Sequence, residues 1–445
     1  MDFFVPPQLN NLCALLSRPL YIVGGFVRNQ ICSLPLKMCD IDIAGDFCAD
    51  EFKKTGAKVL PINKKLGTAQ IHFQDAVFEY TQFRTEEYDG TGSHSPIRTE
   101  FVSSLEIDAK RRDFCANSIY FDIKNNKIVD PLGGVSDTKN KVLKAFDPYL
   151  VFKNDGLRLM RLVRFASELG FEIEQKTFET AKDYCINLKD ISPERKRDEL
   201  DKILISDQKY GIEDAHFKGV NLLHGLNLYD FFLPSIPKME IGQNPTYHKY
   251  NVLIHTFYAV KYAPPIPNIR LAALMHDTGK PVCKQLNGNM NGHAETSAQI
   301  AINELGQNGL KYPNATVGQV AMLCRLHMYD LKGDVSDSKM KIFVATHFEL
   351  IDKLQQLKTA DALATGFPLK FVPRFKAFKD QLIKENAPIY LKSLKVNGHD
   401  AIKAGFKNQQ IALVLTQLWK MCLIDPKLNN RKWLLAQLES RARLQ

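Results

Sequence analysis

The feature that most constrains this chain is a glycine turn followed closely by two acidic residues. Val-Gly-Gly-Phe-Val-Arg spans residues 23–28, and Asp-Ile-Asp spans residues 40–42. The pattern predicts an apolar strand, a tight turn, a short helix and a second strand. Asp40 and Asp42 are two positions apart, so on a strand they would point to the same face. Neighbouring carboxylates repel each other unless a cation lies between them, and their oxygens suit Mg²⁺.

The glycine turn supplies the second part of the same predicted site. Gly24 and Gly25 would let the backbone approach a phosphate group closely, and Arg28 could neutralise its charge. With Asp40 and Asp42 as catalytic metal ligands, these are the parts of a two-metal phosphoryl-transfer site. A loop turn with two surface acids would explain Asp-x-Asp alone, but it would leave the glycines just upstream unexplained.

Composition limits the class of protein. The chain has 445 residues, of which 45% are hydrophobic and 24% charged, as in ordinary globular proteins of several domains. Its formal net charge of +10 suits a polyanionic partner. Nine scattered cysteines, an odd number without a Cys-x-x-Cys pair, favour reduced thiols in a cytoplasmic protein. The first residues show no basic leader and no apolar run is long enough to span a membrane, so no membrane partner is predicted.

The pattern of apolar residues predicts an α+β protein with a mixed-sheet head followed by all-α domains. We expect a head over 1–144, a helical neck over 145–240, a histidine-rich domain over 241–366 and a basic helical tail over 367–445. Short β-branched runs alternate with turns in the head. The predicted strands are residues 20–23, 40–43, 58–61, 68–73, 76–83 and 118–121.

Turn and capping signals divide the rest of the chain. Residues 84–103 contain Asp-Gly-Thr-Gly-Ser-His-Ser-Pro, which predicts a flexible loop. Residues 154–169 repeat apolar side chains at helical spacing. Ser192 and Pro193 predict the N-cap and first position of another helix. Glycine and proline predict breaks at 242–245 and 264–267.

Two further segments of the head and neck could complete the predicted site. Glu79 lies on a predicted strand and could be a third metal ligand, or simply a solvated charge. Arg111, Arg112 and Asp113 could hold a triphosphate and a ribose, although such a run is more often an exposed basic turn.

Asp155, Arg158 and Arg161 follow at i, i+3 and i+6, and would share a helical face. A carboxylate accepts a hydrogen bond from the exocyclic amino group of C or A, and an arginine donates to the adjacent ring acceptor. G and U would leave these groups unpaired, so the pair would select C and A without a template. An intrahelical salt bridge would explain the same spacing without any ligand.

Taken together and in this order, the motifs resemble one family, the tRNA nucleotidyltransferases, which are the CCA-adding enzymes of the bacterial and eukaryotic class in the polymerase-β-like superfamily. The resemblance covers roughly the first half of the chain. The matching segments are Gly24–Arg28, Asp40–Asp42, Arg111–Asn117, Asp130–Gly134, Asp155–Arg161 and Ser192–Arg195.

The resemblance implies addition of CCA to the 3′ end of tRNA from CTP and ATP, with Mg²⁺ on Asp40 and Asp42. The implied nucleotide-binding residues are Gly24, Gly25, Arg28, Arg111, Arg112, Asp113, Asn117, Asp155, Arg158 and Arg161. Glu79, Arg84 and Arg164 are further candidates. The loop over 84–98 would be the flexible element that switches selection from C to A, and its presence argues against a CC-only enzyme. Three positions depart from the family pattern: Asn29 and Asn154 replace acids, and Gly156 replaces a proline.

A separate group of histidines predicts a metal site in the second half of the chain. His276 and Asp277 are adjacent at the end of an apolar run, where both would be costly to bury unpaired. Imidazole and carboxylate ligands suit Mn, Fe, Ni or Zn. With His255 and Asp361, the set resembles the HD phosphohydrolase superfamily. The further candidates are His248, His293 and His327.

Some nucleotidyltransferases carry such an HD domain after the neck, and residues 243–248 resemble the opening of that fused form. The resemblance associates the domain with phosphatase and 2′,3′-cyclic phosphodiesterase activity. The tail is rich in lysine and arginine and would contact tRNA phosphates. Two alternatives remain open: an A-adding enzyme or poly(A) polymerase, and a metal-dependent phosphohydrolase with an RNA-binding head. No obligate protein partner is evident.

Overall fold

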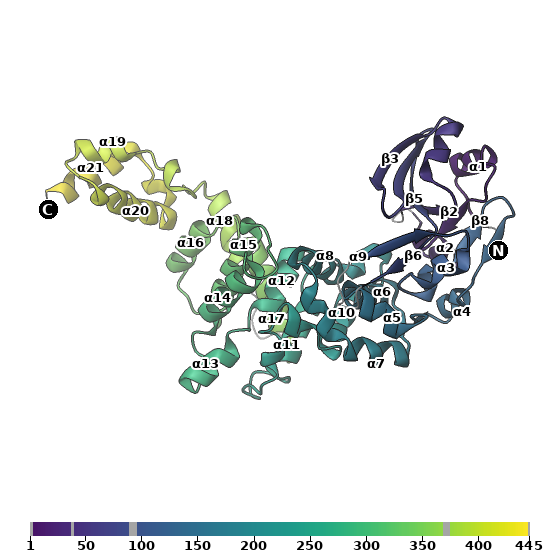
Figure 1. Cartoon of the computed structure of the whole chain (residues 1–445). Coiled ribbons are helices and arrows are strands. Elements are labelled where there is room, and N and C mark those ends of the chain that lie inside the picture. The colour runs from purple at the N-terminus through teal and green to yellow at the C-terminus, as the bar shows by residue number, and fades with distance from the viewer. Residues whose placement is uncertain (1–2, 37–39, 89–95, 368–373, 444–445) are drawn as a thin grey trace. The chain divides into compact units, whose positions relative to one another are not determined.

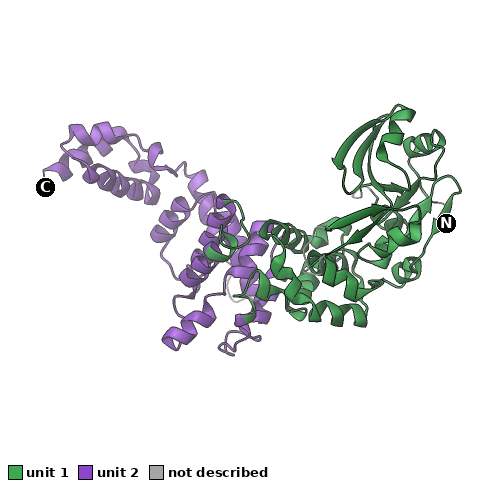
Figure 2. Ribbon diagram, viewed as in Figure 1, with its two compact units in different colours: residues 1–237, 303–313 green, residues 238–302, 314–445 purple. Residues whose placement is uncertain are grey.

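The structure is a computed structural model that describes residues 3–36, 40–88, 96–367 and 374–443. Figure 1 shows the chain coloured from its N-terminus to its C-terminus. It forms two compact units (Figure 2), of which unit 1 comprises residues 1–237 and 303–313, and unit 2 comprises residues 238–302 and 314–445. Each unit is described separately below.

The head of unit 1 is built on a seven-stranded sheet with the strand order β3-β4-β5-β2-β1-β8-β9. β2 and β5 pair in parallel and the other neighbours are antiparallel, so the predicted mixed sheet is confirmed. The strands are β1 (Tyr21–Val23), β2 (Asp42–Gly45), β3 (Lys58–Asn63), β4 (Thr68–Phe73), β5 (Ala76–Gln82), β8 (Tyr120–Asp122) and β9 (Lys127–Val129).

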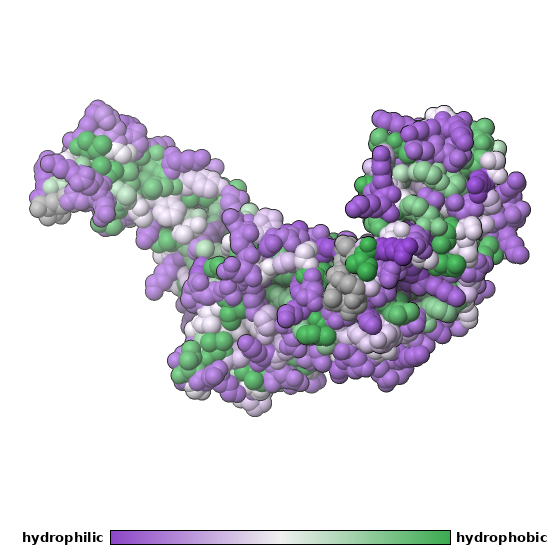
Figure 3. Space-filling view, in the orientation of Figure 1, coloured by the Kyte–Doolittle hydropathy of each residue, from purple (hydrophilic) through white to green (hydrophobic). Residues whose placement is uncertain are grey.

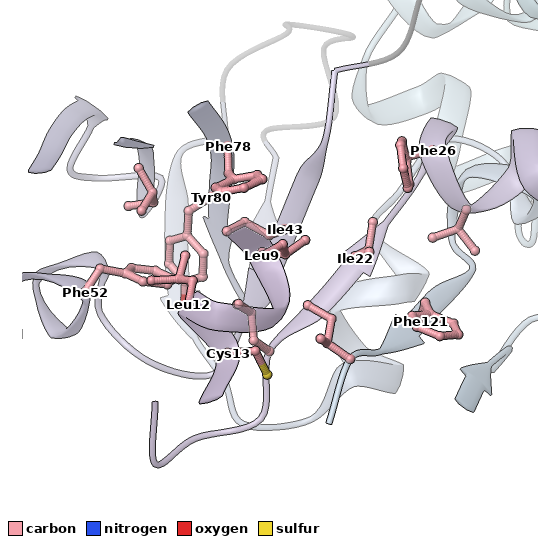
Figure 4. Close-up of a cluster of buried hydrophobic side chains, with 14 of the residues drawn as sticks. Leu9, Leu12, Cys13, Ile22, Phe26, Ile43, Phe52, Phe78, Tyr80 and Phe121 are labelled. Carbon is pink, nitrogen blue, oxygen red and sulfur yellow. The ribbon is translucent and has the colours of Figure 1, made fainter. Parts of the chain in front are cut away.

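Apolar side chains of the central strands form the core of the head. Ile22, Ile43 and Phe78 are fully buried or nearly so, and Leu9 and Leu12 of helix α1 (Pro7–Ala14) pack against the same cluster (Figure 4). The other head helices are α2 (Gly25–Ile31), η1 (Ala49–Thr55), α3 (Leu105–Lys110), η2 (Cys115–Asn117) and α4 (Gly134–Lys139). This core fixes β1, β2 and β5, whose ends carry the candidate site residues.

Two sequence-based expectations for the head need correction. Asp40 precedes β2, which begins at Asp42, so the two acids do not share a regular strand. The segment predicted as a loop contains a hairpin, in which β6 (Arg84–Glu87) pairs antiparallel with β7 (Arg98–Phe101). The sequence missed it because these short strands are polar and half exposed. Residues 89–95 of the predicted loop lie outside the described residues.

The neck is mainly helical, as predicted, but it also contains β11 (Glu172–Ile173), which pairs in parallel with β10 (Val142–Leu143). The predicted helix over 154–169 is present as α6 but begins three residues later, at Leu157, because Asn154 ends α5 and residues 155 and 156 separate the two helices. The neck helices are α5 (Pro148–Asn154), α6 (Leu157–Leu169), α7 (Gln175–Asp183), η3 (Cys185–Asp190), α8 (Pro193–Leu204), α9 (Ser206–Tyr210), α10 (Ala215–Gly225), η4 (Leu228–Phe231) and η5 (Pro237–Met239).

Local packing explains the glycine just before α6. A Cβ atom at Gly156 would lie 2.1 Å from the carbonyl oxygen of Asn187, so only glycine fits this close approach. The family's usual proline would clash at this position, which accounts for one departure noted in the sequence. Ser192 is the N-cap residue of α8 and Pro193 its first residue, as predicted, but the Ser192 side chain makes no capping hydrogen bond.

Unit 2 is helical throughout its described residues. Its helices are α11 (Val252–Tyr262), α12 (Pro267–Met275), α13 (Lys280–Asn287), α14 (His293–Leu305), α15 (Asn314–Leu326), α16 (Asp337–Thr346), α17 (Ile351–Ala364), α18 (Phe375–Lys384), η6 (Leu391–Ser393), α19 (Gly398–Lys403), α20 (Gln409–Ile424), η7 (Pro426–Leu428) and α21 (Arg431–Ala442). Both predicted breaks are confirmed, since 242–245 precede α11, and 264–266 lie between α11 and α12, which begins at Pro267. α14 ends among residues assigned to unit 1.

The motif residues of the tail have structural roles. Asn397 and Asp400 form a capping box at the start of α19, and Asp400 also accepts a hydrogen bond from Arg431 at 2.7 Å.

The β3–β5 end of the head is predominantly hydrophilic in the space-filling view (Figure 3). Among the described residues, we find no helix with the length and hydropathy that crossing a bilayer requires.

Candidate active site and metal centre

Unit 1 contains a cleft of about 550 Å³ that brings together every candidate residue of the head and neck. Those residues are Gly24, Gly25, Arg28, Asp40, Asp42, Glu79, Arg84, Arg111, Arg112, Asp113, Asn117, Asp155, Arg158, Arg161 and Arg164. The cleft is also lined by residues that our sequence-based site had not included: Glu86, Tyr88, Leu157, Phe165, Arg195, Lys209 and Tyr210.

One side of the cleft is acidic. Parallel pairing of β2 and β5 places Asp42 opposite Glu79, and Asp40 lies two residues earlier on the surface. Burial, together with the nearby carboxylates of Glu79 and Asp40, raises the pKa of Asp42 to about 6 against the opposing Arg112 and Arg161. A raised carboxyl pKa next to other acids indicates negative charge that lacks a cation. These three carboxylates could hold Mg²⁺.

The glycine turn lies directly beside these acids. Gly24 has φ +81°, and a Cβ there would lie 3.4 Å from Oδ2 of Asp42. Arg28 follows on α2 and is 2% exposed. Its Nη2 donates to Oδ1 of Asn29 at 2.9 Å, and its Nη1 donates to Oδ1 of Asn117. Asn29 therefore orients the arginine through a neutral amide, where the family usually has an acid.

A buried acid that the sequence did not single out organises the basic wall. Asp108 is fully buried and accepts hydrogen bonds from Arg111 at 2.8 Å and Arg112 at 3.0 Å. Burial alone would raise the pKa of Asp108, but Arg112 and Arg111 hold it at about 2. Arg111 also pairs with Glu86 on β6 at 3.3 Å, and Glu86 pairs with Arg84 at 2.6 Å. The predicted basic run is thus a fixed, ion-paired surface.

Asp113 connects the head to helix α6 of the neck. Its Oδ1 accepts from Nδ2 of Asn117 at 3.1 Å, and its Oδ2 accepts from Nε of Arg161 at 2.9 Å. Arg161 keeps the pKa of Asp113 well below its usual range, although burial opposes this. Arg161 also lies over the ring of Phe165, 5.2 Å from its centre. Asp113 therefore positions Arg161.

The pair Asp155 and Arg158, which the sequence predicts to read the base, differs from the predicted arrangement in one respect. Asp155 lies before α6, not on it, and its Oδ1 accepts from the backbone N–H of Leu157 at 2.9 Å. Arg158 is on α6, with its Nε 3.9 Å from Oδ2 of Asp155, and its Nη2 donates to the carbonyl of Arg111 at 2.9 Å. Both side chains still line the cleft.

The far wall of the cleft combines paired and unpaired cations. Arg164 is paired with Glu199 at 2.6 Å, and Glu168 accepts from Lys209 at 3.0 Å. Within the part of the chain that the structure describes, Nη1 of Arg195 is buried without a hydrogen-bond partner, and burial lowers the pKa of this arginine. An unpaired buried guanidinium N–H is the kind of donor that an anionic ligand would satisfy.

The Asp130-Pro-Leu-Gly-Gly motif has a structural role. The two carboxylate oxygens of Asp130 accept from the backbone N–H groups of Gly134 at 2.8 Å and Val135 at 2.9 Å. A Cβ at Gly134 would lie 2.1 Å from the carbonyl oxygen of Cys115. This motif therefore packs α4 against η2, which leads into Asn117.

Unit 2 gathers the predicted histidines and acids around Asp277. The residues His255, His276 and Asp361 offer ligand atoms within 4.8 Å of one another, and so do His276, Asp277 and His327. Nε2 of His255 lies 2.9 Å from Oδ1 of Asp361, and Nε2 of His276 lies 3.3 Å from Oδ2 of Asp277. This is the donor set that a divalent transition metal prefers.

Charges in the cluster are strongly coupled. Burial opposes protonation of His276, but Asp277 and Asp361 beside it raise its pKa to about 10. Burial would raise the pKa of Asp277, but His276 and Lys280 hold it well below its usual range. Lys280 lies 2.6 Å from Oδ2 of Asp277. The buried acids therefore stay ionised and need positive charge beside them.

The three further histidine candidates occupy different positions. Nε2 of His293 lies 3.3 Å from Oδ1 of Asp277, and Nε2 of His327 lies 3.8 Å from the same atom. The ring of His248 packs edge-on against His255 at 4.9 Å, and burial lowers its pKa to about 4. His293 and His327 thus belong to the cluster, while His248 covers one side of it.

A close backbone approach holds the cluster together. A Cβ at Gly279 would lie 2.4 Å from the carbonyl oxygen of His293, and its backbone N–H donates to Oγ of Ser297 at 2.8 Å. The glycine in His-Asp-Thr-Gly therefore lets α14 approach the turn that carries His276 and Asp277. This contact was not predicted from the sequence.

Two family models and several curated proteins match parts of this chain. Residues 20–144 match the family described as "Poly A polymerase head domain", and residues 170–239 match "Probable RNA and SrmB- binding site of polymerase A". The chain is 34% identical over 226 residues to a CCA-adding enzyme of Streptococcus pyogenes serotype M5 (strain Manfredo). That alignment covers 50% of this chain and 53% of the relative, so the chain spans about half the length of the curated relatives it matches.

Solved structures match over nearly the whole chain. A Bacillus stearothermophilus CCA-adding enzyme in complex with CTP has a TM-score of 0.69 at 22% identity, with 99% of both chains covered. A Thermotoga maritima CCA-adding enzyme complexed with tRNA has a TM-score of 0.57 at 18% identity, covering 99% of this chain and 97% of that one. The family resemblance and the α+β fold class predicted from the sequence are both confirmed.

Proposed function

Because the chain has a poly(A) polymerase head domain within the fold of the CCA-adding enzymes, we propose that it adds CCA to the 3′ end of tRNA without a nucleic-acid template. The observation that carries the proposal is the 550 Å³ cleft of unit 1, in which acids stand at one side and arginines along the others. An enzyme that uses CTP and ATP needs this combination of metal ligands and phosphate contacts.

The acidic side would hold Mg²⁺. Asp40 and Asp42 are the proposed catalytic ligands, and Glu79 stands opposite Asp42 on the next strand. A bound Mg²⁺ would activate the 3′-hydroxyl of tRNA and neutralise the leaving pyrophosphate. Gly24 would let the triphosphate approach the backbone, and Arg28 would donate to it. Arg111 and Arg112, held by Asp108, would form the other phosphate contacts.

The opposite side would read the base. Asp155 would accept from the exocyclic amino group of C or A, and Arg158 would donate to the ring acceptor beside it. The hydrogen bond from Arg158 to the carbonyl of Arg111 would keep the base reader in register with the phosphate wall. Asn154, which replaces an acid, is the last residue of α5 and lies outside the cleft lining.

The hairpin β6–β7 connects to this wall through Glu86 and Arg111. We propose that the segment over 84–98, which includes β6, supports the switch from C to A. A deletion of Asp89–Pro96 should therefore impair the final A addition more than the two C additions. Intact A addition by that variant would contradict this role.

Nucleotide incorporation on three tRNAs tests the proposal. The substrates lack all three terminal nucleotides, lack only the final A, or are complete. A CCA-adding enzyme extends the first with C and A, the second with A only, and leaves the third unchanged. An A-adding enzyme extends only the second, and a poly(A) polymerase also extends the third. No incorporation on any substrate would favour a phosphohydrolase with an RNA-binding head.

We propose a second activity for unit 2, a metal-dependent phosphohydrolase site. Its ligands would be His255, His276, Asp277 and Asp361, with Mn, Ni, Fe or Zn as the suited ions. A bound ion would lower the pKa of a water molecule and polarise a phosphate ester. Hydrolysis of a 2′,3′-cyclic phosphate by the full chain is the test. A chain that hydrolyses no phosphoester and binds no transition metal would contradict it.

The remaining expectations concern partners and location. The basic tail would contact tRNA phosphates through salt-sensitive, sequence-independent interactions. Binding of tRNA should therefore weaken steeply as the salt concentration rises. A cytoplasmic location would suit both these substrates and the free thiols of the eight described cysteines.

A further inference from the structure

Unit 2 carries a row of tyrosine rings along one of its helices. Tyr250 lies just before α11, and Tyr258 and Tyr262 lie on α11 about one turn apart. The ring centres of Tyr250 and Tyr258 are 4.7 Å apart, and those of Tyr258 and Tyr262 are 6.2 Å apart, with an interplanar angle of 22° in both pairs. Tyr262, at one end of the row, is 43% exposed. The row therefore ends in an aromatic ring that is open to solvent.

The segment that carries this row is poor in acids and contains several lysines. Residues 241–294 include one acidic residue, Asp277, against 49 in the whole chain, and its carboxylate is buried in the histidine cluster. The lysines of the segment are Lys249, Lys261, Lys280 and Lys284. Nζ of Lys249 lies 5.7 Å from the centre of the Tyr250 ring. This charge is complementary to a polyanion.

We call Tyr247, Lys249, Tyr250, Tyr258 and Tyr262 the tyrosine surface. Tyr247 is 65% exposed, so packing within unit 2 leaves much of its ring uncovered, as it does for Tyr262. Exposed aromatic rings with lysines between them suit single-stranded nucleic acid, because any base can stack on a ring while the lysines contact the phosphates. A duplex keeps its bases stacked inside the helix and could use only the lysines. The surface therefore favours unpaired nucleotides.

Hydrogen bonds connect the tyrosine surface to the histidine cluster. The carbonyl of Tyr250 accepts from Nε2 of Gln243 at 3.1 Å, and Oε1 of Gln243 accepts from Nζ of Lys280 at 3.0 Å. The same Nζ lies 2.6 Å from Oδ2 of Asp277. His248, two residues before Tyr250, packs edge-on against the cluster. The end of an RNA chain that lies on the tyrosines is thus within reach of the cluster.

We propose that the tyrosine surface binds single-stranded RNA and holds its 3′ end at the histidine cluster. The second part of this inference rests on the phosphohydrolase site proposed above, and it names an RNA end, not a free nucleotide, as the substrate of that site. For an RNA that ends in a 2′,3′-cyclic phosphate, one water molecule adds across one P–O bond. The products are a terminal phosphate monoester and one free ribose hydroxyl, and no further reactant is consumed.

Crosslinking on the full chain tests RNA binding without any variant. A short single-stranded RNA that contains 4-thiouridine is irradiated with the protein, and the crosslinked peptides are identified by mass spectrometry. We expect crosslinks in the peptides that contain residues 247–250 and 258–262. An excess of unlabelled duplex should leave these crosslinks in place. Crosslinks that fall only in the cleft of unit 1 or in the tail would overturn the tyrosine surface.

Hydrolysis tests the delivery of the RNA end. The two substrates are 2′,3′-cyclic AMP and an RNA that ends in a 2′,3′-cyclic phosphate. Tyr258→Ala with Tyr262→Ala should lower kcat/KM for the RNA at least about fivefold, mainly through KM, because base–aromatic stacking is lost. Hydrolysis of cyclic AMP should stay unchanged, and Tyr258→Phe with Tyr262→Phe, which keeps both rings, should retain RNA hydrolysis. The matched control is Tyr149→Ala, which removes a tyrosine of α5 that is 47% exposed.

The results separate this inference from the activity on which it rests. If the parent hydrolyses both substrates and the alanine variant loses nothing on RNA, the tyrosine surface is overturned and the metal-dependent site stands. If the parent hydrolyses neither substrate, the metal-dependent site and the delivery of an RNA end are overturned, and the crosslinks decide RNA binding. An equal loss on both substrates in the alanine variant would also overturn delivery, since the rings would then only support the cluster.

Discussion

The head cleft of unit 1 and the histidine cluster of unit 2 both gather charged groups, but the two regions balance charge in opposite ways. In the cleft, arginines have acidic partners within the protein, as in Arg112 with Asp108 and Arg161 with Asp113. In the cluster, histidine nitrogens and Lys280 surround both buried oxygens of Asp277. The cleft is thus preorganised by its own ion pairs, whereas the cluster gathers potential metal ligands around one buried carboxylate.

The comparison also shows where the cleft itself needs a ligand. Asp42 faces Glu79 and has a raised pKa, and Arg28 is bonded to two amide oxygens instead of a carboxylate. The acidic side of the cleft therefore suits the positive charge of Mg²⁺, and Arg28 suits the negative charge of a triphosphate. Substitutions that inactivate the cleft should therefore leave the activity of the cluster intact, and substitutions in the cluster should leave the activity of the cleft intact.

The largest expected effect comes from removing the head carboxylates. Asp42→Ala should lower nucleotide addition at least about a thousandfold, because a metal ion contributes several kcal/mol to phosphoryl transfer. Binding of tRNA and hydrolysis of a 2′,3′-cyclic phosphate should persist. The measurement is single-turnover CTP incorporation, with Asp40→Ala assayed in parallel. Near-normal turnover in either variant would remove the proposed catalytic role.

The reciprocal change tests the other side of the comparison. His276→Ala with Asp277→Ala should reduce phosphoester hydrolysis by a similar factor, because it removes two of the four proposed metal ligands. CCA addition should stay within about twofold, since the cleft lies within unit 1 and has its own metal ligands. Both reactions are measured on one preparation. Loss of both would mean that the cluster supports the fold or tRNA binding.

A smaller effect is expected at the base reader. Arg158→Ala should raise misincorporation of U and G about 10- to 100-fold relative to C and A, because the contacts that reject them are lost. Arg158→Lys keeps the charge but not the planar donor pair, and should show an intermediate loss. Competition between labelled CTP and UTP gives the ratio. A uniform fall in rate with selectivity unchanged would place base reading elsewhere.

The sequence predicted the parts of the cleft better than their connections. The glycine turn, Asp42 and the base-reading pair were recognised because residue type and spacing reveal a site of this kind. Asp108 and Glu86, which fix the arginines, were missed because an acid beside arginines in the sequence looks like a solvated surface. Only the fold shows that these acids are buried.

For the strands and helices, too, the sequence predicted what residue type and spacing reveal and missed what depends on tertiary contacts. Strands with apolar residues, such as β4 and β5, were predicted nearly to their ends. The polar hairpin β6–β7 was not, since its pairing depends on partners and not on hydrophobic pattern. The break before α6 lies at Asp155, whose backbone is extended, and the glycine that follows it allows the close approach of the Asn187 backbone. That contact is tertiary and leaves no periodic trace in the sequence.

The smallest expected effect concerns stability and tests whether the head acids lack a cation. The pKa of Asp42 is raised to about 6 from 3.8. The folded chain therefore binds this proton more tightly than the unfolded chain, and stability falls as the pH rises between these two values. Without Mg²⁺ at pH 7, Asp42→Asn should be more stable than the wild type by about 1–3 kcal/mol.

Urea unfolding of unit 1 at several pH values is the measurement. The difference between Asp42→Asn and the wild type should vanish below about pH 4, where the carboxyl is protonated in both states. Mg²⁺ should stabilise the wild type and not the variant, because only the carboxylate binds the ion. Asp183→Asn, an exposed acid on α7, is the matched control and should show neither effect. A wild type that is more stable than Asp42→Asn at pH 7 without Mg²⁺ would mean that the cleft already balances this charge internally, as it does for Asp108 and Asp113.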